Sequence, residues 1–127
     1  MVFAPHWYDG VTLSFKKYFS WLGVDTSRHP MKIALGRQNR VDLFTRQIGT
    51  QVQRARRDLG SAPVVIGETG IPFDLDGKKA YQTGKFEQQE KAMDDVIQAL
   101  DRNFVNYTLW NYTADNDNHR GDQWNNE

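Results

Sequence analysis

The chain has 127 residues, of which 39% are hydrophobic and 13% aromatic, so its length suits one domain and its apolar content suits a packed core. Its 16 basic and 16 acidic residues cancel, which argues against nucleic acid or an anionic membrane surface as a partner. Cysteine is absent, which excludes disulfides and thiolate chemistry, and no apolar run approaches the roughly 20 residues of a membrane span.

The N-terminal third predicts one short strand and one weak helix. Residues 2–5 predict a strand that runs into the polar aromatic motif "HWYD". The same region lacks the basic segment and long apolar core of a signal peptide, which leaves the compartment open, with the cytoplasm as the default. Residues 13–22 predict a weak helix, and the following stretch, broken by Pro30 and Gly36, predicts a loop.

The middle of the chain gives stronger predictions. Asn39 is a favourable N-cap for a helix that Gly60 can end. Residues 64–66 are consecutive β-branched residues and predict a strand covered on both faces. The apolar stripe of the predicted helix consists of Val41, Phe44, Ile48, Val52, Ala55 and Leu59.

The last third predicts a second helix and a third strand. A loop is expected over residues 70–82, and Thr83 is expected to cap a helix that ends at Asn103. Residues 104–112 predict a strand, and a polar tail follows. The inner face of the helix is predicted to hold Phe86, Glu90, Met93, Val96, Ile97 and Leu100, with Glu90 as the single polar misfit.

Strands therefore alternate with helices, which is typical of βαβ units in an α/β protein with a parallel sheet. In such folds the site lies at the carboxyl ends of the strands. The three predicted strands end in residues 6–9, in Glu68 and in residues 110–112, all of which carry polar or aromatic side chains. We therefore expect one site built from these three strand ends.

Glu68 is an acid at a predicted strand end, where it stands between two glycines after an apolar run. A carboxylate there is costly unless it reaches water or hydrogen-bond donors, so a turn-capping role and a functional role are both open. His6 and Tyr8 lie two residues apart in a strand and should face the same side, where both could donate to a carboxylate or to a sugar hydroxyl. A structural histidine is the alternative. Trp110 is either a platform for a sugar ring or a core aromatic residue.

No metal site and no cofactor are expected. His29 and His119 have no ligand-like spacing with His6 or with acids. The sequence also lacks the glycine-rich motifs that hold phosphates in nucleotide-binding proteins.

Three motifs make the chain resemble the C-terminal part of glycoside hydrolase family five, a family of clan A (β/α)8 barrels. They are "PHWYD" (residues 5–9), "VVIGETGIPFD" (64–74) and "LWNYTADNDNHRGDQWNNE" (109–127). The last two are most similar to the endoglycoceramidase-related branch, which includes fungal steryl-β-glucosidases and glucosylceramidases. The resemblance implies a partial TIM barrel, from strand six to just past strand eight. It makes residues 1–127 the C-terminal portion of a glycoside hydrolase catalytic domain.

The resemblance also implies roles for individual residues. Glu68 matches the nucleophile of a retaining β-glycosidase, and His6 and Tyr8 match the pair that holds the nucleophile and the sugar. Trp110 matches the tryptophan under the sugar. Asn111 and Trp124 are further candidates for substrate binding. The implied substrate is a β-glucoside or a glycolipid, such as glucosylceramide or a steryl glucoside.

One departure from the family affects activity. A retaining glycosidase needs a second carboxylate about 5–5.5 Å from the nucleophile as acid and base. The family carries it after strand four in an Asn-Glu-Pro motif, which this sequence lacks, together with strands one to five and the final helix. We therefore expect no hydrolysis by the chain alone, and the missing N-terminal part of the barrel as its partner. Open strand edges predict marginal stability. An inactive sugar-binding remnant and an unrelated small α/β domain are the alternatives.

Overall fold

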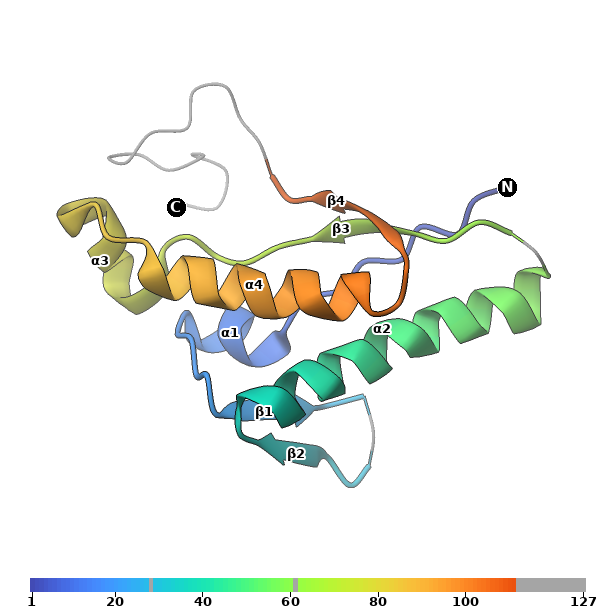
Figure 1. Cartoon of the computed structure of the whole chain (residues 1–127), viewed down its shortest axis with the longest axis horizontal. Helices are drawn as coiled ribbons and strands as arrows, with labels where there is room; N and C mark the ends of the chain where they lie inside the picture. The colour runs from blue at the N-terminus through green and yellow to red at the C-terminus, as the bar shows by residue number, and fades with distance from the viewer. Residues whose placement is uncertain (28, 61, 112–127) are drawn as a thin grey trace.

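A computed structural model describes residues 1–27, 29–60 and 62–111 (Figure 1). These residues form an α/β structure with two small sheets and no closed barrel. No helix in these ranges is long and apolar enough to cross a bilayer. The elements in chain order are α1 (Gly10–Phe15), β1 (Leu22–Asp25), β2 (Lys32–Leu35), α2 (Arg37–Leu59), β3 (Val65–Thr69), α3 (Leu75–Thr83), α4 (Glu87–Asp101) and β4 (Asn106–Leu109).

β3 is the central strand of a parallel layer. It pairs with β4 in parallel, and this confirms the parallel pairing that the alternating pattern predicts. Along its other edge, β3 takes the N-terminal segment through parallel bridges from Phe3 to Val64 and from His6 to Glu68. Backbone hydrogen bonds of 2.9–3.0 Å accompany these bridges, including one from the Trp7 amide to the Glu68 carbonyl. The predicted first strand is thus an extended segment beside β3.

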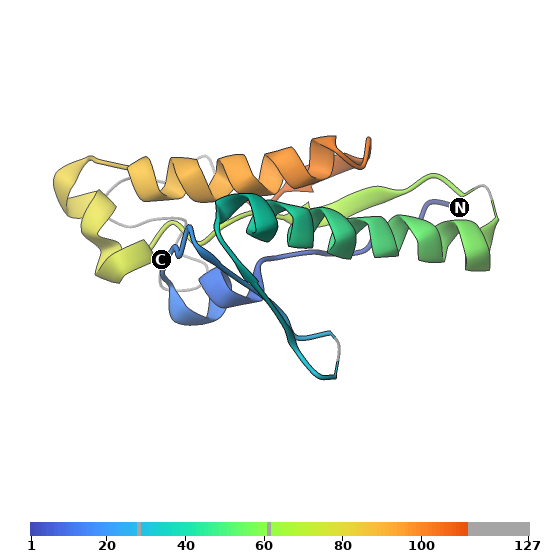
Figure 2. The same cartoon turned by 60° about the horizontal axis from the view of Figure 1, so that its bottom comes forward.

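The two long helices cover one face of this layer. Figures 1 and 2 show α2 and α4 lying alongside each other against β3. Their apolar residues recur at helical spacing, so each presents one stripe to the interior, and each fully buried Leu, Ile or Phe contributes about 1.5–3 kcal/mol. The buried core consists of Trp7, Tyr18, Phe44, Ile48, Ile66, Ile71, Leu75, Ala92, Val96, Ala99 and Leu100.

The region between residues 13 and 36 differs from the sequence prediction. The helix predicted over residues 13–22 is wrong, because α1 ends at Phe15 and Lys16 takes a left-handed conformation with φ of 49°. The predicted loop is also wrong, since β1 and β2 form an antiparallel hairpin that Figure 2 shows projecting from the start of α2. Packing on α2 explains this: a Cβ atom on Gly23 would lie 3.1 Å from Arg40 Cγ. Such contacts override weak local propensity.

The start of α2 lies two residues before the predicted N-cap. Gly36 is the N-cap, with φ of 91°, and the helix begins at Arg37. Asn39 lies within the first turn, where its side-chain amide donates to the Leu35 carbonyl at 2.8 Å. The predicted end at Gly60 is confirmed. The predicted strand over residues 64–66 extends to Thr69, so Glu68 lies inside β3 rather than after it.

The second helical region also differs in its boundaries. The predicted loop over residues 70–82 contains α3, and Thr83 ends α3 instead of capping α4, whose N-cap is Phe86. α4 ends at Asp101, so the predicted end at Asn103 is two residues late. β4 covers only part of the strand predicted over residues 104–112.

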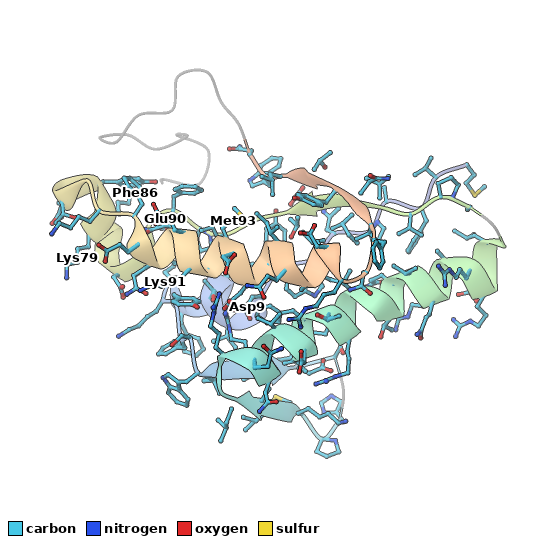
Figure 3. All side chains as sticks on the ribbon, viewed as in Figure 1. Asp9, Lys79, Phe86, Glu90, Lys91 and Met93 are labelled. Carbon is cyan, nitrogen blue, oxygen red and sulfur yellow. The ribbon has the colours of Figure 1, made fainter. Side chains whose placement is uncertain are left out.

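The buried face of α4 matches the prediction only in part, because Val96 and Leu100 are buried and Met93 packs against the core, as predicted, but Glu90 does not face inward. Glu90 is exposed, and Figure 3 shows it with Phe86 and Met93 on the side of α4 away from Lys91. The prediction of Glu90 as a polar misfit on the inner face is therefore wrong. The polar residues that α4 buries are Gln89 and Asp95. Gln89 donates to the Phe73 carbonyl at 2.9 Å, and Asp95 binds arginines of α2.

Candidate active site

A β-bulge determines where the Glu68 side chain points. Ile66 and Thr69 of β3 lie opposite Tyr107 and Leu109 of β4, so three steps on one strand match two on the other. Both Ile66 and Thr69 are fully buried, although residues three apart in a regular strand face opposite sides. The extra residue leaves Glu68 between them, with 27% of its side chain exposed. The carboxylate lies on the face of the layer away from α2, because it meets Tyr8, whereas the alternate residue Trp7 packs on Phe44 of α2.

Two side chains of the N-terminal segment meet the Glu68 carboxylate. The Tyr8 hydroxyl donates to Glu68 Oε1 at 2.6 Å. The His6 Nδ1 atom lies 3.4 Å from Oε2, and the His6 side chain is 59% exposed. The sequence predicted that His6 and Tyr8 face the same side, and the structure brings both to one carboxylate. Each carboxylate oxygen thus has its own neighbour.

The residues that alternate with this pair face the opposite way. Trp7 and Asp9 are buried, whereas His6 is exposed and Tyr8 is half-buried. The Trp7 indole donates to Gln47 Oε1 at 3.3 Å, and its ring meets Phe44 edge-on at 5.0 Å between centroids. This alternation is the period of an extended strand, in which one face serves the core and the other serves the site.

Contact with Glu68 changes the acidity of Tyr8. Burial is the largest cause and raises the pKa of the Tyr8 hydroxyl well above its usual value of 10.0. The hydrogen bond to Glu68 and the negative charge of that carboxylate raise the pKa further. Tyr8 therefore stays protonated at any ordinary pH and acts as a hydrogen-bond donor. It cannot act as a base near neutrality.

Trp110 follows β4 and lies next to the end of β3. Its backbone amide donates to the Thr69 carbonyl at 2.8 Å, and the residue is 41% exposed. The backbone approach is close, because a Cβ atom on Gly70 would lie 2.6 Å from the Trp110 carbonyl oxygen. Asn111 is half-buried beside it. Trp124, Asn125 and Tyr112 lie outside the described residues.

Among residues 1–27, 29–60 and 62–111, no group of three or more His, Asp or Glu side chains could hold a metal ion. The candidate site presents a carboxylate with a tyrosine hydroxyl and an imidazole beside it. A carboxylate held by a tyrosine hydroxyl has a fixed orientation and keeps lone pairs available for a carbon electrophile. An exposed aromatic ring at the neighbouring strand end suits the apolar face of a sugar.

Sequence reasoning missed a buried ion cluster directly behind the site. Arg40, Asp9 and Asp95 are each no more than 6% exposed, and Arg40 joins the two aspartates. A usable signal was present for both partners: Arg40 lies four residues before Phe44, and Asp95 lies between Ala92 and Ala99 at helical spacing. Helical spacing thus marks both charges as core positions, although it does not specify that they meet each other.

Comparison with known proteins gives relatives of one kind, all of which are much longer than this chain. No family model matches. A glucosylceramidase of Cryptococcus neoformans var. grubii is 37% identical over 133 residues, and the match covers 100% of this chain and 18% of the relative. An ergosteryl-beta-glucosidase of Saccharomyces cerevisiae is 38% identical, with 98% of this chain and 17% of the relative covered.

Solved structures agree with these relatives. The crystal structure of Cryptococcus neoformans sterylglucosidase 1 superposes with a TM-score of 0.89 at 34% identity, over 98% of this chain and 19% of that one. The chain thus spans just under a fifth of the proteins that it matches. It is homologous to fungal glycosidases named for glucosylceramide and steryl glucosides, and its fold is that of a part of a sterylglucosidase.

Proposed function

We propose that the chain carries the nucleophile half of a retaining β-glucosidase site. In this proposal residues 1–127 are the C-terminal portion of a glycoside hydrolase family five catalytic domain, a partial (β/α)8 barrel. The main support for this proposal is the 2.6 Å hydrogen bond from the Tyr8 hydroxyl to Glu68 Oε1, with His6 beside the other oxygen. It supports the nucleophile role because the acid is oriented, lies on a helix-free face and belongs to a parallel strand.

In the proposed reaction Glu68 is the nucleophile of the first step. A carboxylate oxygen attacks the anomeric carbon, the bond from that carbon to the leaving oxygen breaks, and a covalent glycosyl ester forms. Tyr8 and His6 hold the carboxylate in line, and Trp110 and Asn111 border the sugar. Trp124 is proposed as a further substrate contact. Water then cleaves the ester. Both steps need a second carboxylate to protonate the leaving oxygen and to activate the water.

The second carboxylate is proposed to come from the N-terminal part of a barrel, as the partner of this chain. The sequence has no Asn-Glu-Pro motif. An open pocket of about 430 Å³ runs along the N-terminal segment, between the hairpin and α2, and includes Trp7, Arg46 and Gln47. A preceding element of a barrel is proposed to pack beside this pocket. The proposed substrates are β-glucosides, with glucosylceramide and steryl glucosides suggested by the names of the relatives.

A chimera tests the proposal. Residues 1–127 replace the matching segment of the Cryptococcus sterylglucosidase, and hydrolysis of an aryl β-glucoside is measured. We expect the chimera to hydrolyse it, and Glu68→Gln to lower kcat by several orders of magnitude, because the leaving group then has no attacking carboxylate. Glu90→Gln, at an exposed acid of α4, is the matched control and should leave kcat unchanged.

Two results would contradict the proposal. One is a folded chimera without activity. The other is a Glu68→Gln chimera that retains the rate of the parent chimera. The isolated chain is expected to leave the same glucoside intact, because nothing in it is proposed to protonate the leaving oxygen.

A further inference from the structure

Arg40 lies buried between two carboxylates at the start of α2. Only 1% of its side chain is exposed. Its Nη2 atom donates to Asp9 Oδ2 at 2.8 Å, and its Nη1 atom donates to Asp95 Oδ2 on α4. Arg37 also donates to Asp95, from Nε to Oδ1 at 2.8 Å. The guanidinium therefore ties two helices to the residue that directly follows Tyr8.

Asp9 is held from a second direction. It is the N-cap of α1 and accepts hydrogen bonds from the Val11 amide at 3.2 Å and from the Thr12 amide at 3.3 Å. The Thr12 hydroxyl donates to Asp9 Oδ2 at 2.6 Å. The same carboxylate oxygen thus serves both α1 and Arg40, and Figure 3 places Asp9 between α4 and the start of α2. A side chain with this many fixed partners leaves its own backbone little freedom.

Trp7 anchors the other side of Tyr8 to the same helix. It hydrogen-bonds Gln47 and packs on the Phe44 ring. That ring in turn lies 4.6 Å from the Arg40 guanidinium carbon. Both neighbours of Tyr8 are therefore fixed on one face of α2. Because side chains alternate along an extended strand, Tyr8 itself points to the face of the parallel layer away from α2, toward Glu68.

We propose that the Asp9–Arg40–Asp95 cluster positions the Tyr8 hydroxyl on Glu68, with Asp9 and Arg40 as positioning residues. The proposal rests on the proposed function only in giving this hydrogen bond a catalytic purpose. A short bond such as Tyr8 to Glu68 tolerates displacements of about 0.5 Å at most, so the backbone on both sides of Tyr8 must be fixed. Stability alone is a weak reason for the cluster, because a buried ion pair rarely outperforms apolar packing.

Asp9→Asn removes the charge and one of the two acceptor oxygens. Asparagine also caps helices, so its single carbonyl oxygen can keep the N-cap bond from Val11, whereas an amide nitrogen in place of Oδ2 cannot accept from Arg40 or Thr12. The readout is the ¹³Cζ resonance of Tyr8 in the full 127-residue chain with ¹³C-labelled tyrosine. Glu68→Gln provides the reference for a Tyr8 hydroxyl without its carboxylate. We expect the Asp9→Asn resonance to move at least halfway to this reference.

Arg40→Lys is the second variant, because a lysine keeps the charge but cannot bridge two carboxylates as a guanidinium does. The same displacement of the Tyr8 resonance is expected. Asp42→Asn is the matched control. It breaks an exposed ion pair with Arg102, 2.8 Å long, that also joins α2 to α4 but does not reach Tyr8. Its Tyr8 resonance should not move.

The outcomes separate the inference from the proposed function. A folded Asp9→Asn or Arg40→Lys chain with an unmoved Tyr8 resonance overturns the positioning role. Loss of the folded state in both variants also overturns it, because the cluster is then a folding determinant. The resonance does not depend on hydrolysis. A displaced resonance together with an inactive chimera therefore supports positioning while rejecting the glycosidase proposal.

Discussion

The Trp110 carbonyl oxygen lies so close to Gly70 that a Cβ atom on that residue would be only 2.6 Å from it. The Trp110 amide also donates to the Thr69 carbonyl at 2.8 Å. The ends of β3 and β4 are thus joined by direct backbone contact. Only glycine permits this approach, because any other residue would place a Cβ atom against the carbonyl. The contact holds Trp110 beside Gly70, which is two residues after Glu68 in the sequence.

Gly70→Ala is expected to displace Trp110 and to destabilise the chain. Overpacking against backbone costs about 1–3 kcal/mol in free energy of unfolding, because the carbonyl cannot rotate away as a flexible side chain can. Urea unfolding measures the loss, and the indole N–H resonance of Trp110 reports its displacement. Gly10→Ala is the control, since a Cβ atom on Gly10 meets nothing within 4 Å. Equal midpoints for both variants would refute the expectation.

Leu100→Ala is expected to lower the free energy of unfolding by about 2–5 kcal/mol, because Leu100 is fully buried in the core. Leu59→Ala, at the exposed end of α2, should cost less than about 1 kcal/mol. Both substitutions remove the same atoms, so their difference isolates burial. Chemical denaturation of both variants checks it, and similar costs would argue against the described core.

The stability of the chain is expected to fall at high pH. Burial, followed by the hydrogen bond and charge of Glu68, raises the pKa of Tyr8. Burial and Asp95 raise the pKa of Tyr18, against the opposing charges of Arg40 and Arg37. Both folded pKa values lie above the unfolded value of about 10, so the folded chain binds more protons there. Stability is therefore complete below about pH 10 and is lost as the pH rises above it.

Urea midpoints at about pH 8, 10 and 11 measure this loss. The decline should be smaller in Tyr8→Phe and in Tyr18→Phe, because phenylalanine has no proton to lose. A midpoint that stays level above about pH 10 would contradict the raised pKa values.

The isolated chain is expected to self-associate through the outer edges of its parallel layer. Within residues 1–27, 29–60 and 62–111, β4 pairs on one side only, and its Leu109 is half exposed. Leu109→Lys should reduce association, because a charge on an edge strand opposes strand addition. Leu59→Lys, an equally apolar-to-charged change on α2, is the control. Sedimentation at several concentrations measures the effect, and equal behaviour of the two variants would assign association to another surface.

Local periodicity predicted the face shared by His6 and Tyr8, because alternation along a strand depends only on the strand itself. It also predicted the two long helices and the parallel pairing. The hairpin escaped prediction because β1 and β2 are only four residues each and depend on packing against α2. Glu90 was misplaced because two apolar stripes overlap on α4, and tertiary packing selects the one that contains Ala92 and Ala99.

The sequence indicates which residues form the candidate site, but not the buried contacts that lie behind them. Motifs bring Glu68, His6 and Tyr8 to attention, whereas the bond between Arg40 and Asp95 joins residues 55 positions apart in the sequence. No local pattern specifies which charge meets which across such a separation. The β-bulge was equally hidden, since a strand's register is set by its neighbours rather than by its own residues.

The bulge in β3 has a consequence for how such a chain can change. Ile66 and Thr69 belong to the interior on either side of it, and Glu68 between them faces outward. Substitutions at position 68 therefore alter the chemistry at the strand end without altering the packing beneath it. Selection can act on the two properties separately, so the same scaffold can lose or regain this carboxylate through a single codon.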